Sequence, residues 1–385
     1  MITIEKVTAR AELLRMEAEW NALLRSSASD TITLTHEWIS TWWDVFRGGR
    51  GLFVLLARED GKLVGIAPLL RRRVRRFGIL LRRIEFLASG EAEADEICSD
   101  YLDFVIETGR EREVLGAITE FLARDKGWDE LLLTDIAGES PNVAVLRELG
   151  AKPGWSFAVT REQTCIFVPL PASRDELLKT LSSQKRKRLR KDRRVFAEQE
   201  MRVQKVDTSE EFETAFAHLV NLHQERWTSR GYPGSFSSGP FMKFHRELAR
   251  KIVPHSWLKI WILWQEDTPL CAVYDFVYGA KIFHYQSGLS ARETPLISPG
   301  MLIWDFALED GIEHGLSECD FLKGEVGSYK TSWGGQTRPI LQVRLARRSV
   351  RENVFQGVNR VVDWLRPWRQ RAFEILKKVR KPNER

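Results

Sequence analysis

Two hydrophobic patterns alternate along the chain: short apolar runs bounded by Gly, Pro or Asp, and longer stretches with apolar residues every three to four positions. The first pattern indicates strands and the second amphipathic helices. We predict helices over 11–24, 35–46, 111–126, 212–226 and 301–314. We predict strands over 52–57, 63–70, 83–87, 101–106, 130–134, 258–264, 271–278, 281–287 and 318–322. This order is typical of a mixed α/β protein.

Turn residues divide the chain into two similar halves. Asp60-Gly61 predicts a hairpin between 52–57 and 63–70, and Gly279-Ala280 predicts a type II′ hairpin. Pro169-Leu-Pro171 is the predicted linker, and Ser173 with Glu176 resembles a capping box that opens a helix carrying a basic run. The second half repeats the hairpin, helix and strand of the first. We therefore expect domains at 1–170 and 171–346, followed by a tail at 347–385.

Composition excludes several classes of protein. The 385 residues are 43% hydrophobic, enough for a sizeable core, but no apolar run approaches the roughly 20 residues that span a bilayer. The sequence starts without a secretory signal pattern, so we expect a cytoplasmic protein. The four cysteines are scattered, no His-x-x-x-His pair occurs, and P-loop and Gly-x-Ser-x-Gly motifs are absent. We expect no metal site, and we exclude P-loop NTPases, zincins and standard serine hydrolases.

Positive charge is concentrated in three runs. The formal charge is +6, yet residues 344–385 alone hold 13 Lys/Arg against 4 Asp/Glu. Lys185–Arg194 holds eight basic residues and one acid, and Arg71–Arg76 is a smaller cluster. Such runs bind phosphates of nucleic acid, anionic lipid or a cofactor, or form solvated surfaces. The tail has helical apolar spacing, which predicts a basic amphipathic helix on a membrane surface or against the protein body.

The strongest chemical signal is a strand–helix–strand segment after residue 281. Ser298-Pro299-Gly300-Met301 starts its helix, and the strand at 318–322 follows. A crossover of this kind makes the two strands parallel and sets the helix N-terminus beside their carboxyl ends. Free amide N–H groups there attract anions, and Gly300 permits close approach. We predict a pyrophosphate-bearing cofactor at Ser298–Met301; an ordinary capped helix is the alternative.

Neighbouring motifs carry a family resemblance. Ser298–Gly300, Asp320-Phe-Leu-Lys-Gly324 and Tyr329-Lys-Thr-Ser-Trp333 follow one another in the order seen in the BioF2-like or CelD-like acetyltransferase family. This family is a branch of the GNAT superfamily related to the FemAB-like transferases. A Trp-rich helix at 37–43, Ala-Pro-Leu-Leu at 67–70 and Asp-Tyr-Leu-Asp at 100–103 extend the resemblance over most of residues 1–345. The resemblance implies two tandem GNAT-like lobes of α/β class, with mixed sheets, plus the basic helical tail.

The resemblance also implies an activity, namely transfer of an acetyl or other acyl group from acyl-CoA to an amine or hydroxyl, associated with cell-surface polysaccharide synthesis. Tyr329 is the expected acid for the leaving thiolate, or it packs on Trp333. His284 or Tyr285 is the expected base, at most one of them facing the cleft, or a structural residue. Lys330 is expected to meet a cofactor phosphate. Asp100 is expected to hold the acceptor across the lobe interface, or to cap a turn.

Two other functions remain open at this stage. A FemAB-like transferase using aminoacyl-tRNA would give the Lys185–Arg194 run an RNA partner. A non-catalytic GNAT-like scaffold would use the basic tail at a membrane-associated assembly. The expected partners are a small-molecule or glycan acceptor, with peripheral contact at the inner membrane face through the tail; nucleic acid is expected only as tRNA.

Overall fold

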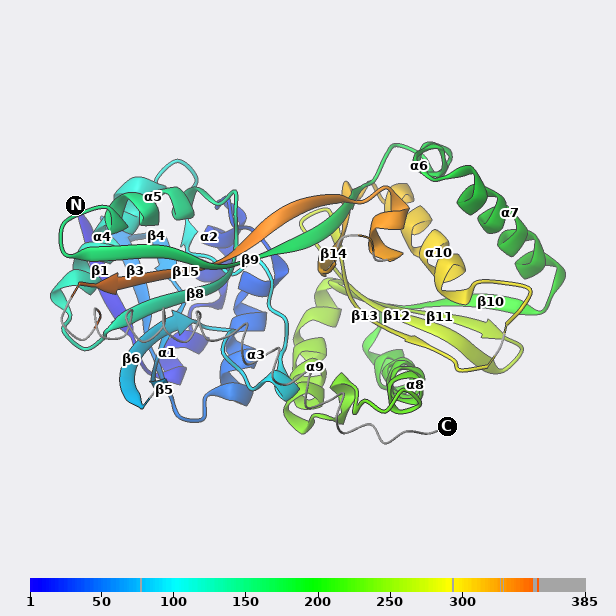
Figure 1. The fold of residues 1–385 in the computed structure, drawn as a ribbon, viewed down its shortest axis with the longest axis horizontal. Helices are drawn as coiled ribbons and strands as arrows, with labels where there is room; N and C mark the ends of the chain where they lie inside the picture. The colour runs from blue at the N-terminus through cyan, green and yellow to red at the C-terminus, as the bar shows by residue number, and fades with distance from the viewer. Residues whose placement is uncertain (77, 293, 326, 328, 349–351, 353–385) are drawn as a thin grey trace, which may run out of the picture.

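The computed structural model describes residues 1–385 except 77, 293, 326, 328, 349–351 and 353–385. Two lobes lie side by side, and two long strands, β9 (Trp155–Pro169) and β15 (Gln336–Arg347), run from one to the other (Figure 1). Most of the tail predicted at 347–385, including its amphipathic helix, lies outside the described residues.

The N-terminal lobe holds the elements up to β9. Its helices are α1 (Arg10–Leu14), α2 (Glu17–Arg25), α3 (His36–Phe46), α4 (Glu111–Arg124) and α5 (Pro141–Gly150), with short 3-10 helices η1 (Ile32–Leu34) and η2 (Glu93–Asp95). Its other strands are β1 (Ile2–Val7), β2 (Arg50–Leu52), β3 (Val54–Glu59), β4 (Lys62–Ala67), β5 (Leu69–Arg76), β6 (Ile79–Phe86), β7 (Val105–Ile106) and β8 (Glu130–Ala137).

The C-terminal lobe holds the elements between β9 and β15. Its helices are α6 (Arg174–Thr180), α7 (Ser183–Glu198), α8 (Ser209–Thr228), α9 (Gly239–Ile252) and α10 (Pro299–Glu313), with 3-10 helices η3 (Ser235–Ser237), η4 (Val253–His255) and η5 (Tyr329–Trp333). Its strands are β10 (Met201–Val206), β11 (Leu258–Gln265), β12 (Thr268–Tyr278), β13 (Lys281–Leu289) and β14 (Glu318–Lys323). Helices α8 and α9 cover one face of this sheet, and α6, α7 and α10 cover the other (Figure 1).

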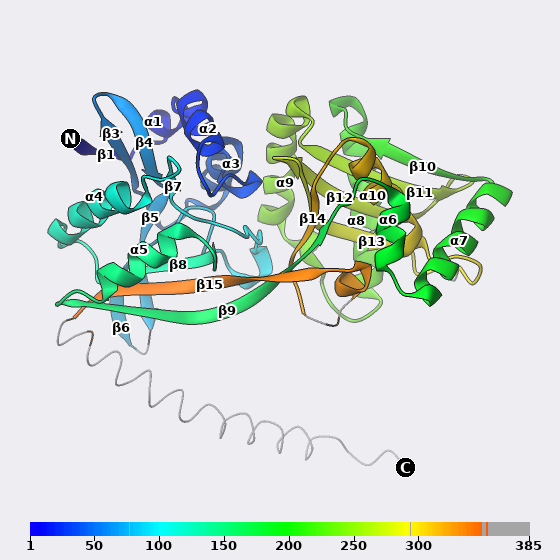
Figure 2. The same ribbon diagram turned by 90° about the horizontal axis from the view of Figure 1, so that it is seen from above.

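One large sheet passes through both lobes. Its strand order is β10-β11-β12-β13-β14-β9-β15-β8-β6-β5-β2, and a second sheet has the order β1-β3-β4-β7. Strand β15 pairs antiparallel with β9 on one side and with β8 on the other, so the last described strand completes the N-terminal lobe (Figure 2). The domain limits 1–170 and 171–346 stay a prediction, because β9 and β15 each belong to both lobes.

The same crossover occurs once in each lobe. In the C-terminal lobe, β13 and β14 pair in parallel over Lys281–Phe283 and Glu318–Asp320, with α10 in the connection. In the N-terminal lobe, β6 and β8 pair in parallel over Arg83–Glu85 and Glu130–Leu132, with α4 in the connection. Each strand pair then diverges. This divergence opens the carboxyl ends of the strands beside the crossover helix.

Buried apolar residues form two cores. The larger one is continuous from the N-terminal lobe to the sheet face under α8 and α9, and the smaller one lies under α6, α7 and α10. Trp38 of α3 shows the continuity, because its ring meets Phe244 of α9 and Phe276 of β12 edge to face. Side chains of the two lobes therefore pack against each other, and this packing fixes the orientation of one lobe relative to the other.

Four predictions of local structure need correction. The helix at 11–24 is two helices, broken at Arg15-Met16, which allows both Leu13 and Trp20 to be buried. The Gly279-Ala280 turn is type I′, since both residues have positive φ. Ser173 caps α6 by accepting from the Glu176 N–H, whereas the basic run lies on α7 after a break at Leu181-Ser182. The strand at 101–106 shrinks to Val105–Ile106, because the preceding loop turns toward the other lobe.

Candidate functional site

A basic pocket lies between α7 and the N-terminus of α10. Its volume is about 770 Å³, within the range of small-molecule sites. Ser298 and Met301 form its α10 side, and seven α7 residues with Ser182 form the other: Gln184, Lys185, Lys187, Arg188, Arg190, Lys191 and Arg194. The predicted anion site and the predicted basic run therefore face each other. No sequence pattern predicted that they lie together, since about 100 residues separate them.

The first turn of α10 has donors available. Pro299 occupies the first helical position, no side chain of Ser298 caps the helix, and among the described residues no acceptor meets the N–H groups of Gly300 and Met301. A side chain at Gly300 would enter open space. Asp192 of α7 accepts from the Ser298 N–H, at 3.2 Å, and from Arg188. The inner end of the pocket is therefore partly neutralised, whereas its outer part is cationic.

Lys185 connects α7 with η5. Its Nζ donates to the Ser332 carbonyl and hydroxyl at 3.0 and 2.7 Å and lies over the Trp333 ring. Burial lowers the pKa of Lys185 to about 8. Tyr329, the predicted acid, begins η5, but its side chain is outside the described residues. Its backbone lies on η5, the same short helix whose Ser332 accepts hydrogen bonds from Lys185.

Lys330 is held internally. Its Nζ donates to the carbonyls of Phe321 and Lys323 at 2.6 and 3.0 Å, and burial lowers its pKa. These contacts fasten η5 to the end of β14. Its predicted contact with a cofactor phosphate stays a prediction, and these two carbonyls already engage two of the three N–H groups of the ammonium.

A second cluster lies on the other side of η5, where the lobes meet. The Lys323 Nζ, at the end of β14, lies 3.2 Å from the Asp100 carboxylate and 2.9 Å from that of Asp135, both in the N-terminal lobe. The Lys323 main-chain N–H also donates to Asp100 at 2.8 Å. Asp100 is fully buried, and Lys323 retains some exposure. The cluster thus joins an ammonium to two carboxylates across the interface.

Burial raises the pKa of Asp100 to about 7, despite the nearby Lys323. Burial opposes the charge on Lys323, but the two carboxylates outweigh it and raise the pKa of the ammonium. Lys323 is consequently held as a cation, and the pKa of Asp100 lies well above its ordinary range. Such a pair supplies a base and a fixed positive charge.

Unusual backbone geometry is concentrated at this cluster. Cys98, Tyr101, Asp135 and Leu322 all have positive φ, at 51°, 66°, 59° and 58°. For residues other than glycine this conformation is strained and is often found at functional sites.

Hydrogen bonds from the C-terminal lobe hold the loop that carries Asp100. The Tyr285 hydroxyl donates to the Ile97 carbonyl at 2.6 Å, and the Tyr101 hydroxyl donates to Asp320 at 2.6 Å. Tyr285 is also 3.2 Å from His245, and burial raises the pKa of its hydroxyl. This placement makes Tyr285 a positioning residue for the loop; its predicted role as base stays untested.

His284 points to the opposite face of β13, as strand alternation predicted. It is buried against Trp304 and Phe321, and its Nδ1 lies 2.9 Å from Asp275. Burial lowers the pKa of His284 and raises that of Asp275. This pair lies in the core beneath α10, and its predicted role as base also remains a prediction.

Sequence reasoning missed Lys323 and Asp135. Lys323 stood inside the Asp320–Gly324 motif, yet nothing local distinguished it from a surface lysine. The available signal was its place at the end of a strand in a crossover, where functional side chains gather. Nothing in the sequence around Asp135 distinguished it, because its partner, Lys323, belongs to the other lobe.

The described part of the chain contains no group of three or more residues that fits a metal ion. Within that same part, no helix combines the length and apolarity needed to cross a bilayer.

Comparisons with known proteins agree with this architecture. Residues 183–331 match the family model described as the acetyltransferase (GNAT) domain, a range that includes α7, α10 and Lys323. No curated protein matches the chain in sequence.

Among solved structures, the chain is similar to FemX, with 13% identity, a TM-score of 0.61, and coverage of 92% of this chain and 99% of that one. It is also similar to the C-terminal domain of a putative lysylphosphatidylglycerol synthetase from Agrobacterium fabrum, with 10% identity, a TM-score of 0.51, and coverage of 92% and 97%. These identities are low, so the likeness concerns the fold. Residues 183–331 therefore match a GNAT-type acetyltransferase domain, which lies in the C-terminal part of a mixed α/β fold.

Proposed function

We propose that this protein transfers an acyl group from acyl-CoA, acetyl-CoA being the simplest donor, to an amine or hydroxyl acceptor. The observation that carries the proposal is the pocket between α7 and α10. Its open amide N–H groups and cationic rim suit a pyrophosphate, and its volume of about 770 Å³ suits a bulky donor. The match of residues 183–331 to the acetyltransferase domain supports the same reaction class.

The residues fit the phosphates of such a donor. Lys187, Arg190 and Lys191 are exposed on the pocket wall and have no acidic partner among the described residues. The Gly300 and Met301 N–H groups complete the anion site from the opposite wall. When bound, acyl-CoA supplies an activated thioester carbonyl.

Two groups of the interlobe cluster fit the chemistry that follows. Asp100, with its pKa near 7, accepts the proton of the acceptor amine or hydroxyl. Lys323 provides a fixed positive charge for the oxygen that becomes negative in the transition state. Tyr329 remains our proposed proton donor to the departing thiolate. Helix η5 contacts both the pocket, through Lys185, and the cluster, through Lys330.

Calorimetric titration with acetyl-CoA tests the proposal. The double variant Lys187→Gln/Arg190→Gln should weaken binding about tenfold or more, because two charge-assisted contacts to phosphate are lost. Lys152→Gln/Arg161→Gln, an equal change of exposed charge on the other lobe, is the matched control. Failure of the unmodified protein to bind acetyl-CoA, or equal affinity in both variants, would reject the proposal.

A second candidate is an aminoacyl-tRNA-dependent transferase of the FemAB-like kind. The charge of α7 favours it, since this helix presents a row of cations to solvent. The similarity to the fold of FemX is compatible with it. Titration with tRNA in place of acetyl-CoA distinguishes the two candidates. With either donor, we propose an amine or hydroxyl acceptor and a role in cell-surface polysaccharide synthesis.

A further inference from the structure

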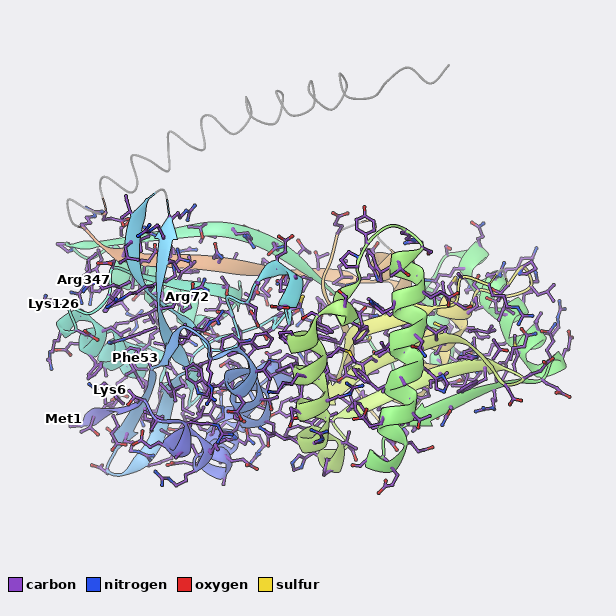
Figure 3. The ribbon with its side chains drawn as sticks, turned by 90° about the horizontal axis from the view of Figure 1, so that it is seen from below. Met1, Lys6, Phe53, Arg72, Lys126 and Arg347 are labelled. Carbon is purple, nitrogen blue, oxygen red and sulfur yellow. The ribbon has the colours of Figure 1, made fainter. Side chains whose placement is uncertain are left out.

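The hairpin of β5 and β6 extends beyond the large sheet. Strand β5 pairs with β2 only up to Arg72, and β6 pairs with β8 only from Arg83 onward. Between those points the two strands pair with each other as a two-stranded ribbon. Figure 3 shows this hairpin continuing past Arg72 and projecting from the lobe. We refer to residues 73–76 and 79–82 as the ribbon.

The ribbon concentrates positive charge on one face. Arg73 lies directly opposite Arg82, and Arg75 lies two residues further on the same face, opposite Leu80.

Acidic side chains pair with Arg71, Arg82 and Arg83, whereas Arg73 and Arg75 differ from them. Arg71 pairs with Asp125, Arg83 pairs with Glu85 and Glu130, and Arg82 pairs with Asp129. Arg73 and Arg75 are exposed, and no carboxylate of the described residues meets them. The outer part therefore suits an anionic partner.

Apolar residues share the end of the ribbon. Leu80 is 43% exposed, and Val74 and Ile79 are half-buried. Exposed leucine beside exposed arginine matches the boundary between lipid headgroups and acyl chains, where the apolar group inserts and the guanidinium meets phosphate. The phosphates of a nucleic acid would bind the arginines but would leave Leu80 exposed to water.

The C-terminal residues of this chain are not a suitable partner for the ribbon, because they are also basic. Residues 353–385 carry nine Lys/Arg and three Asp/Glu, a net charge of the same sign as that of the ribbon. Arg347 and Glu352, the residues that precede them, line a cavity of about 290 Å³ with Leu81 and Arg82.

We propose that the ribbon docks on an anionic lipid bilayer, with Arg73 and Arg75 on lipid phosphates and Leu80 in the interface. This surface belongs to the N-terminal lobe and is independent of the proposed acyl transfer.

Co-sedimentation of the full-length protein with phosphatidylglycerol/phosphatidylcholine vesicles tests the proposal. Arg73→Gln/Arg75→Gln should lower the partition coefficient about 10- to 30-fold, since each arginine near an anionic surface contributes about 1 kcal/mol. Leu80→Ser should lower it a few-fold. Arg161→Gln/Arg230→Gln, which removes two exposed arginines elsewhere, should bind as the unmodified protein does. Pure phosphatidylcholine vesicles should retain none of these proteins.

Three results would overturn the proposal. The unmodified protein fails to sediment with anionic vesicles, or the ribbon variant, with an unchanged melting curve, binds as well as the control. The third is a ribbon variant that loses affinity for duplex RNA while keeping its affinity for vesicles, which would assign the ribbon to nucleic acid.

Discussion

The two crossover helices, α4 and α10, occupy equivalent places in the two lobes but differ in charge where they begin. The first turn of α4 contains Glu111 and Glu113, whereas the first turn of α10 contains no acidic residue and faces the cations of α7. Carboxylates at a helix N-terminus satisfy its dipole and repel a further anion. The start of α10 is therefore open to an anion, whereas the equivalent start of α4 already has its own carboxylates nearby.

The lobes also contribute differently to the interlobe cluster. The C-terminal lobe supplies the cation, Lys323, and the N-terminal lobe supplies two carboxylates, Asp100 and Asp135. Neither lobe holds the cluster alone.

The largest effect is expected at Lys323. Lys323→Met removes the fixed charge from the cluster, so turnover should fall about 10³-fold, near the upper range for loss of one electrostatic stabiliser. Release of free thiol from acetyl-CoA measures it. Lys205→Met, which removes a half-buried lysine 2.8 Å from Asp310 in the same lobe, is the control and should retain turnover. Similar activity in both variants would remove Lys323 from the mechanism.

Asp100 should give the reaction its pH dependence. Burial raises the pKa of this carboxyl to about 7, and the base form exists above that pH. The value of kcat/KM should therefore rise with pH through about 7 in the unmodified protein. Asp100→Asn should lose this rise and about 10²-fold in rate. A pH profile that keeps its limb near 7 in the variant would assign the limb to another group.

Placing an acidic residue in the first turn of α10 tests directly whether charge at the helix start controls anion binding. Gly300→Asp gives α10 the acidic first turn of α4, and the side chain enters open space. We expect acetyl-CoA affinity to fall about tenfold, while the helix gains roughly 0.3–1 kcal/mol from its dipole. Gly300→Ala is the steric control and should bind nearly normally. A loss of affinity in both variants would point to crowding rather than charge.

The smallest expected effect is on the lobe contact. Tyr101→Phe removes the 2.6 Å hydrogen bond to Asp320 and leaves a buried carboxylate with one partner fewer. The free energy of unfolding should fall by about 1–3 kcal/mol. Chemical denaturation measures it, and Tyr232→Phe at an exposed position is the control. An unchanged free energy would mean that the contact does not stabilise the interface.

Local pattern was enough to predict the crossover of the C-terminal lobe, because β13, α10 and β14 are consecutive and strongly apolar. It was not enough for β9 and β15. The middle of β9, around Thr160–Glu162, is exposed and polar, so it lacks the apolar run that indicates a strand. Its pairing with β15 joins segments more than 150 residues apart. Such strands are stabilised by long-range hydrogen bonds rather than by local hydrophobic pattern.

The candidate site shows the same limit. The α10 start and the basic run were each visible in the sequence, but their meeting depends on how α7 packs. Asp100 was visible as part of a motif, whereas its partner Lys323 required the docking of one lobe on the other. Residues that act through tertiary contact give little signal in a single sequence.

Calorimetric titration of acetyl-CoA into the unmodified protein, Gly300→Asp and Gly300→Ala tests the central claim most directly. If the donor phosphates bind at the α10 start, the unmodified protein binds, the alanine variant binds nearly as well, and the aspartate variant binds about tenfold more weakly. Equal affinity in all three folded proteins would contradict the account, because the donor would then bind away from this helix.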